Sequence, residues 1–262
     1  MRNLFSYENK IMQMLMLVGD MIILNLLFLL CCLPLPLGAV YLSQTLGLQW
    51  GDLLFWGLLV LSLFPMGAAQ AGLYTAVKVM MDKEDDSSLV SAYFRGFRSG
   101  FGRISLANTL LLLLIAVTLV AIINSFLLQA SGLSEGGGLP LVVSCLALFI
   151  IISYQGVLPL FHSRFDCSVL QLFRNCAYVT LLHPIRSLGA ACLTWFPLLL
   201  ALLNLNIFVA VTPLFIALAF AVAHTFAYTI MRKPLEQMIA GYYEKNGLED
   251  PNKPAPEPQE EE

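Results

Sequence analysis

Few side chains of this chain are able to do chemistry, and most of them lie inside long apolar runs. Asp20 stands in the first run and is followed by Asn25 on the same expected helix. A carboxylate inside a membrane span is costly and usually faces water or the bundle interior. Asp20 therefore either contacts an ion, a proton or a substrate, or it is a salt-bridge partner at the cytoplasmic interface of a span that begins later. We favour the second interpretation.

The other polar residues of the apolar runs are amides and one histidine. Hydrogen bonds of such side chains between helices contribute about 0.6–2 kcal/mol each, so we expect them to join helices, although together they would also suit a polar cavity. His224 has no acid near it in sequence, which favours hydrogen-bonded packing over a catalytic or metal-binding role. The candidate intramembrane polar contacts are Asp20, Asn25, Gln70, Asn108, Gln155 and His224, with Asn124 as a further amide.

Signatures of the common enzyme classes are missing from the sequence. The chain has no GxSxG, no HExxH and no Walker-type loop, and Asp20 has no acidic partner within a span. The six cysteines show no CxxC pair and no Cys/His ligand spacing, which is typical of small buried hydrophobes. We therefore expect no enzymatic activity, no metal site and no cofactor.

Residues 91–103, SAYFRGFRSGFGR, interleave arginines with aromatic rings, a composition that would suit a nucleic-acid surface. On a helix, however, the rings and Arg95 fall on opposite faces, with Arg98 at the boundary, so they do not converge on one ligand. We expect no nucleic acid here. The rings are expected to enter the acyl boundary or pack on the bundle, while the arginines meet lipid phosphates. The candidate lipid- or partner-docking residues are Arg95, Arg98, Arg103 and Arg174.

The composition identifies the solvent that these elements face. The chain is 58% hydrophobic and only 12% charged, against roughly 45–50% and about 25% in ordinary soluble domains. Its mean hydropathy is +0.79. A soluble protein of 262 residues cannot hide that much apolar side chain from water, so lipid is the solvent that fits.

The apolar runs predict an all-α bundle of about six spans. A span needs about 20 apolar residues in a helix, and the expected spans are residues 11–33, 53–77, 104–128, 139–161, 188–204 and 209–231. Asn204, Asn206 and Pro213 mark the expected turn between the last two. Within the second span, PMGAAQAG (residues 65–72) is typical of close helix packing. The first span has no convincing small-x-small cleavage site after it, so we expect it to stay in the membrane.

The basic residues predict the orientation of the spans. All 14 Lys and Arg fall on one side of this six-span arrangement, whereas the opposite loops carry only Asp52 and Glu135. Because basic loops stay in the cytoplasm, both termini are predicted to be cytoplasmic.

Two cytoplasmic loops and the tail complete the predicted organisation. Residues 88–101 and 168–181 have the pattern of amphipathic helices at the inner interface, and DKEDDSS (residues 82–88) supplies N-cap serines and acids before the first of them. We expect one transmembrane domain over residues 1–235. The cytoplasmic tail, residues 236–262, is expected to be disordered at its acidic, proline-rich end.

Four segments together resemble the YesL-like family of bacterial polytopic membrane proteins, a domain of unknown function. They are VGDMIILNLLFLLCCLP (residues 18–34), PMGAAQAGLYTAVKVMMDKED (65–85), LVSAYFRGFRSGFGR (89–103) and RFDCSVLQLFRNCAYVTLLHPIRSL (164–188). Here residues 35–64 intervene where typical members run on almost directly, and Met66 replaces a usual threonine. The resemblance implies about six helices, the bacterial inner membrane and frequent association with carbohydrate uptake systems of the ABC type.

Three functions compete on this evidence. The first is a non-enzymatic accessory protein that contacts ABC transporter subunits through the two amphipathic helices. The second is a permease or small-molecule transporter, with Asp20 and the amides along its path, although the EAA…G…I-x-LP pattern of classical importer permeases is missing. A membrane-embedded enzyme comes third. The sequence leaves the ligand and the oligomeric state open.

Overall fold

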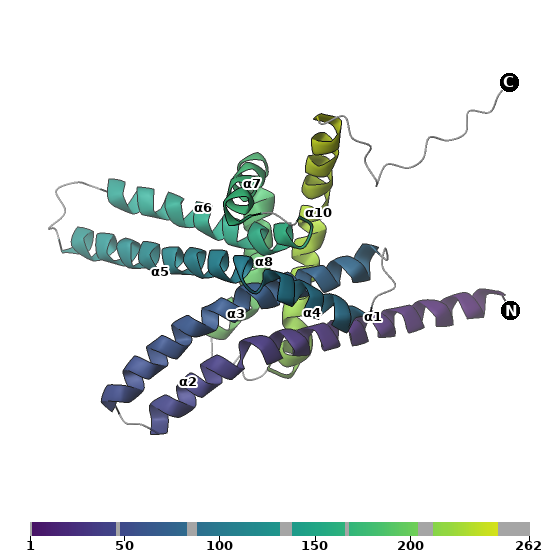
Figure 1. The fold of residues 1–262 in the computed structure, drawn as a ribbon, viewed down its shortest axis with the longest axis horizontal. Coiled ribbons are helices and arrows are strands. Elements are labelled where there is room, and N and C mark those ends of the chain that lie inside the picture. The colour runs from purple at the N-terminus through teal and green to yellow at the C-terminus, as the bar shows by residue number, and fades with distance from the viewer. Residues whose placement is uncertain are drawn as a thin grey trace.

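The computed structural model describes residues 2–45, 48–82, 88–131, 138–165, 168–203 and 212–245, and this part of the chain contains helices and turns but no strand. The predicted all-α bundle is confirmed (Figure 1). Its helices are α1 (Arg2–Cys32), α2 (Pro34–Thr45), α3 (Leu48–Asp82), α4 (Leu89–Gly100), α5 (Arg103–Ala130), α6 (Leu139–His162), α7 (Val169–Leu182), α8 (Pro184–Leu203), the π-helix η1 (Phe215–Ala219) and α10 (Phe220–Lys245).

Five helical segments in the described ranges are long and apolar enough to cross a membrane. They are Met12–Cys32, Val60–Asp82, Arg103–Ala130, Leu139–His162 and Thr212–Gly241. The predicted span 188–204 lies in α8, which passes the same test only together with α7, from which it is bent by 112°. The chain is therefore an integral membrane protein with five or six candidate spans.

The stretch between the first two spans forms a helical hairpin that the sequence did not predict. Pro34 and Pro36 lack the N–H that a continuing helix needs, and α1 breaks at Leu33 before α2 begins. The path stays helical in direction, because the amide of Leu37 donates to the carbonyl of Leu33 at 3.0 Å. After residues 46 and 47, which lie outside the described part, α3 runs back along α2 (Figure 1). The residues that intervene relative to the YesL-like pattern, 35–64, thus belong mainly to α2 and the first half of α3.

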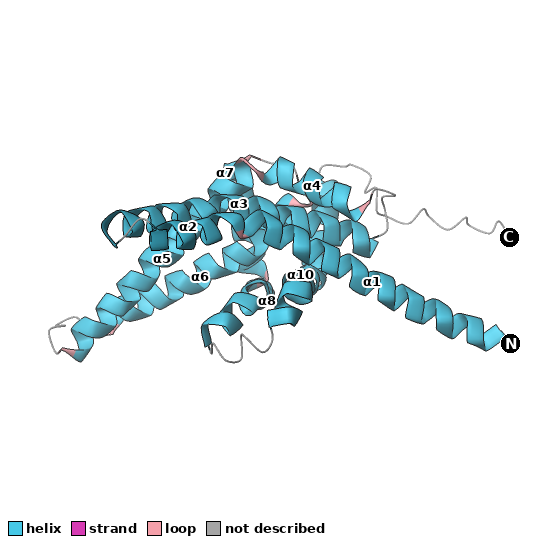
Figure 2. Ribbon diagram, turned by 90° about the horizontal axis from the view of Figure 1, so that it is seen from below, coloured by secondary structure: helices cyan, strands magenta, loops and turns pink. Residues whose placement is uncertain are grey.

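Both predicted amphipathic helices are present, as α4 and α7, and they lie along the same side of the molecule (Figure 2). Each begins with a serine cap. Ser88 accepts a hydrogen bond from the amide of Ser91, and Ser168 forms a capping box with Gln171. The acids expected before α4, in residues 83–87, lie outside the described residues. The tail beyond Lys245, whose end is expected to be disordered, also lies outside them. So do Asn204 and Asn206, whereas Pro213 stands in the first turn of the last span.

Helix α4 is packed against the bundle and does not lie only at the predicted membrane interface. Tyr93 is fully buried, and its hydroxyl donates to the carbonyl of Leu27 on α1 at 3.4 Å. Burial raises the pKa of this phenol, with a further contribution from the Cys31 thiol, so the hydroxyl stays neutral. Helix α3 packs closely against α4 at Gly72, where an added Cβ would lie 2.8 Å from the carbonyl oxygen of Tyr93. Only glycine permits this approach of the two backbones.

Replacing Gly72 by alanine is expected to lower the thermal unfolding midpoint of the detergent-purified protein. The new methyl group would meet backbone atoms of α4, and overpacking of this kind costs about 1–3 kcal/mol. The matched control is Gly102→Ala, because nothing lies within 4 Å of a Cβ added there. Equal midpoints for the two variants would contradict the close packing of α3 against α4.

Candidate functional site: a buried ion-pair cluster

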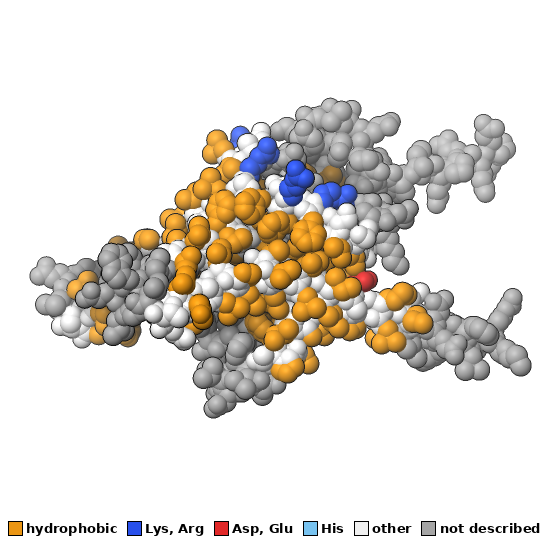
Figure 3. Space-filling model, turned by 60° about the horizontal axis from the view of Figure 1, so that its bottom comes forward, with side chains coloured by type: hydrophobic (Ala, Val, Ile, Leu, Met, Phe, Trp, Pro, Cys, Tyr) orange, Lys and Arg blue, Asp and Glu red, His pale blue; other side chains and the backbone are white. Residues whose placement is uncertain are grey.

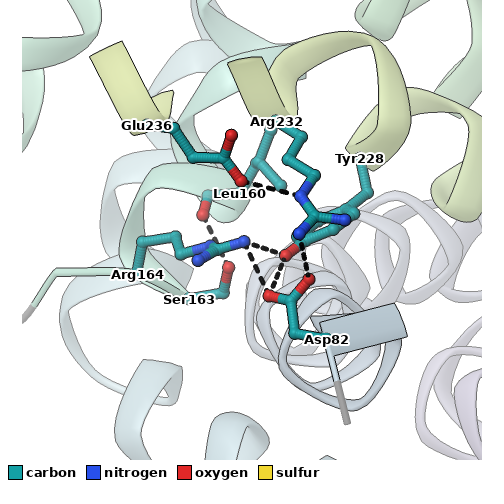
Figure 4. Close-up of polar contacts among 7 residues, drawn as sticks. All are labelled: Asp82, Leu160, Ser163, Arg164, Tyr228, Arg232 and Glu236. Atoms are coloured by element: carbon teal, nitrogen blue, oxygen red, sulfur yellow. Dashed lines mark hydrogen bonds and ion pairs between the residues drawn. The ribbon is translucent and has the colours of Figure 1, made fainter. Parts of the chain in front are cut away.

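The ends of two spans meet the side of a third at one place, where charged side chains gather. Asp82 is the last residue of α3, and Arg164 follows the end of α6. Tyr228, Arg232 and Glu236 stand on successive turns of α10, so their side chains share one face of that helix. Figure 4 shows these side chains pointing toward one another from the three elements. We call these five residues the Asp82 cluster.

The carboxylate of Asp82 is the centre of the cluster. Its Oδ2 accepts hydrogen bonds from Arg164 Nη2 at 2.9 Å and from the hydroxyl of Tyr228 at 2.7 Å, and its Oδ1 lies 3.3 Å from Arg232 Nη2. The side chains of Asp82 and Arg164 are only 3% and 9% exposed. A charge buried to this degree is tolerated only when it is paired and hydrogen-bonded, and Asp82 meets both conditions.

The remaining contacts make the cluster a connected network. Arg164 also donates to the hydroxyl of Tyr228, and its guanidinium lies 5.2 Å from the centroid of the Tyr228 ring. Arg232 Nε donates to Glu236 Oε1 at 2.7 Å, one turn further along α10. Two carboxylates and two guanidinium groups give the cluster a net charge of zero. It therefore joins the ends of α3 and α6 to α10 without leaving an excess buried charge.

A second polar contact joins α1 to the start of the last span, through the side chain of Asn25. The π-helix η1 does not continue the hydrogen-bond register of α10, so backbone groups at the junction need other partners. The Nδ2 of Asn25 donates to the carbonyl of Ile216 at 2.6 Å and to that of Phe215 at 3.2 Å. Its Oδ1 accepts from the amides of Phe220 and Ala221 at 2.8 and 3.1 Å. All the donors and acceptors of this buried amide thus serve the helix junction.

His224 is buried beside this junction, one turn after Phe220. Its Nδ1 is 2.8 Å from the carbonyl oxygen of Phe220, and its ring lies between those of Phe28 and Tyr74, with centroids 5.7 and 4.8 Å away. The hydroxyl of Tyr74 in turn bonds Thr194 of α8 at 3.1 Å. His224 is thus packed between two aromatic rings and bonded through Nδ1, whereas its Nε2 has no hydrogen-bond partner among the described residues.

The amide side chains of the middle spans differ in burial and in hydrogen bonding. Asn108 of α5 and Gln155 of α6 are buried and joined by a hydrogen bond from Gln155 Nε2 to Asn108 Oδ1. A Cβ added at Gly67 of α3 would lie 2.7 Å from that of Asn108, so the small-residue segment allows the close approach that its sequence predicted. Gln70 is buried, but its Oε1 has no hydrogen-bond partner. Asn124 is exposed on α5, so its expected role in joining helices is wrong.

Asp20 lies apart from these groups. It is half-buried on α1, and no hydrogen bond or ion pair joins it to another described residue. The four candidate docking arginines, Arg95, Arg98, Arg103 and Arg174, are exposed on α4, at the start of α5 and on α7. Within the described ranges, no three His, Cys, Asp or Glu residues come close enough to hold a metal ion.

The Asp82 cluster was missed in the sequence because its members were interpreted separately. Asp82 was assigned to the acidic lead-in of α4, whereas it ends α3 and turns into the bundle. The arginines were used only as markers of orientation. A usable signal was present, since Asp82, Arg164 and Arg232 each stand at the predicted cytoplasmic end of a different span.

Residues 21–124 match the model of a family described as "Protein of unknown function, DUF624". The matched range begins in α1 and ends in α5, so it includes Asn25, Asp82 and the whole of α4. The resemblance to the YesL-like family is consistent with this match and is confirmed at the level of a domain of unknown function. Comparison with curated proteins and with solved structures gave no match.

Replacing Asp82 by asparagine is expected to lower the free energy of unfolding by about 3–5 kcal/mol, because it leaves the buried Arg164 charge without its partner. The control is Glu236→Gln, which breaks the exposed pair with Arg232 and is expected to cost about 0.2–1 kcal/mol. Chemical unfolding of both variants in the same detergent measures the difference. If the two variants lost the same stability, Asp82 would not be the centre of the cluster.

Proposed function

We propose that this integral membrane protein is a non-enzymatic accessory component of a carbohydrate uptake system of the ABC type, in a bacterial cytoplasmic membrane. The observation that carries the proposal is an apolar corner where α7 meets α8. Leu181 and Ile185, on either side of the bend at His183 and Pro184, are 77% and 85% exposed. Leu182 between them is also exposed. We call Leu181, Leu182 and Ile185 the α7–α8 corner.

The direction of α7 supports a docking role for this corner. Helices α7 and α8 are bent by 112°, so if α8 crosses the bilayer, α7 runs nearly along its surface. The corner is then held at the predicted cytoplasmic boundary, where the helices of a transporter's membrane subunit also end. Exposed apolar side chains at such a boundary suit a partner that is itself embedded in the membrane. The membrane subunit of the importer is the occupant that we propose.

The proposal assigns no catalysis because the buried polar side chains have structural roles. Asp82, Asn25, Asn108 and His224 are the polar side chains that an enzyme or a proton relay would use. Asp82, Asn25 and Asn108 are engaged in hydrogen bonds that join helices or complete a helix junction, and His224 bonds a carbonyl of its own helix. A framework of this kind suits a protein that presents surfaces to a partner.

A second candidate is a small-molecule transporter, and one observation favours it. The last span is interrupted by η1, and discontinuous helices near buried polar side chains are typical of transporter binding sites. Asn25 and His224 lie at this interruption. The Asp82 cluster would then act as a gate at the cytoplasmic ends of three spans.

Copurification from native membranes tests the first proposal. The wild-type chain is expected to retain subunits of a sugar importer, and Leu181→Ser with Ile185→Ser is expected to reduce the retained amount severalfold, because the apolar contact is lost. The matched control is Leu127→Ser with Phe126→Ser, a pair exposed near the far end of α5. The proposal fails if no transporter subunit copurifies with the wild-type chain and sugar uptake is unchanged in a deletion strain. Solute flux by the chain alone in proteoliposomes would instead favour the second candidate.

A further inference from the structure

The outward face of α4 carries a shallow groove that lies apart from the Asp82 cluster and from the α7–α8 corner. It is lined by Ser91, Phe94, Arg95, Arg98 and Ser99 and has a volume of about 680 Å³. The four polar residues stand at successive turns of one helical face, which brings two hydroxyls and two guanidinium groups to one surface. From this groove we propose that α4 binds the phosphate of an anionic phospholipid in the predicted cytoplasmic leaflet.

The chemistry of the lining matches a phospholipid phosphate. Guanidinium groups bind phosphate oxygens with paired N–H donors, and the hydroxyl of Ser91 adds a donor beside them. The sequence contains no Asp or Glu from Ser88 to Ser134, so the charged residues of α4 and α5 are all basic. The acids that precede α4, Glu84 to Asp86, lie outside the described residues.

Apolar surface beside the groove indicates a lipid rather than a soluble anion. Phe94 lines the same groove and is 46% exposed, so one ligand would meet both a charged rim and an aromatic ring. The expectation that the rings and Arg95 do not converge on one ligand is therefore wrong for Phe94. Figure 3 shows arginine and lysine side chains gathered along the edge of a broad hydrophobic surface. In a leaflet, the charged side chains would face the lipid headgroups and the hydrophobic surface would face the acyl chains.

The groove is also held in place before any ligand binds. Its helix is fixed to α3 by the close approach at Gly72 and to α1 by Tyr93. Ser99 donates to the carbonyl of Gly96 at 3.0 Å and lies 3.5 Å from His162 Nε2 at the end of α6. Binding therefore has to order the lipid and the two arginine side chains, but not the helix, and such preorganisation favours affinity.

Lipid titration of the detergent-purified full chain, followed by native mass spectrometry, tests the proposal. The probes are phosphatidylglycerol and, as the zwitterionic comparison, phosphatidylcholine. Arg95→Gln with Arg98→Gln is expected to weaken phosphatidylglycerol binding roughly 25-fold, from the usual contribution of a basic residue near an anionic leaflet. Arg186→Gln with Lys233→Gln removes the same charge from exposed positions on α8 and α10 and is expected to weaken binding much less, because neither side chain lines the groove.

Three outcomes would overturn the proposal. Equal losses in the two double variants would mean that the total charge, and not the groove, attracts the lipid. Unchanged binding in the Arg95 and Arg98 variant would exclude the groove. Displacement of phosphatidylglycerol by equimolar glycerol phosphate would show a soluble anion as the ligand. The variant Phe94→Ala keeps both arginines, and it is expected to weaken phosphatidylglycerol binding while leaving glycerol phosphate binding unchanged. Unaltered elution from a sizing column shows that each variant is folded.

Discussion

A carboxylate that is almost fully buried must be neutralised where it lies, and this requirement at Asp82 determines how the ends of α3 and α6 meet α10. The partners come from helices far apart in the sequence, Arg164 after α6 and Tyr228 and Arg232 on α10. Neither arginine reaches Asp82 unless α6 and α10 lie beside the end of α3. The electrostatic cost of one residue thus fixes the relative position of three long helices, which apolar packing in lipid would specify only weakly.

The same principle operates deeper in the bundle, where no water completes the hydrogen bonds of the backbone. Asn25 supplies both donors and acceptors to the junction of η1 and α10, and Asn108 with Gln155 joins α5 to α6. These polar groups are therefore spent on the framework. The two surfaces proposed to bind partners, the α7–α8 corner and the groove of α4, are exposed instead.

The sequence predicted what depends on local pattern. Hydropathy predicted the spans in α1, α5 and α6 to within a few residues, and helical periodicity predicted α4 and α7. It could not predict the hairpin of α2 on α3, because residues 35–64 read equally well as a connector and as helix. It also missed the Asp82 cluster, since pairing between residues separated by more than sixty positions leaves no local signal. Asn124 was misassigned for a related reason, because composition alone does not tell which face of α5 is turned outward.

The central claim is that Asp82 and Arg164 stabilise the bundle through each other, and a double-mutant cycle measures this directly. The free energy of unfolding is determined for the wild-type chain, Asp82→Asn, Arg164→Gln and the double variant in one detergent. The double variant is expected to be more stable than the sum of the single losses implies, with a coupling energy of about 2 kcal/mol or more. Losses that add to within about 0.5 kcal/mol would contradict this claim.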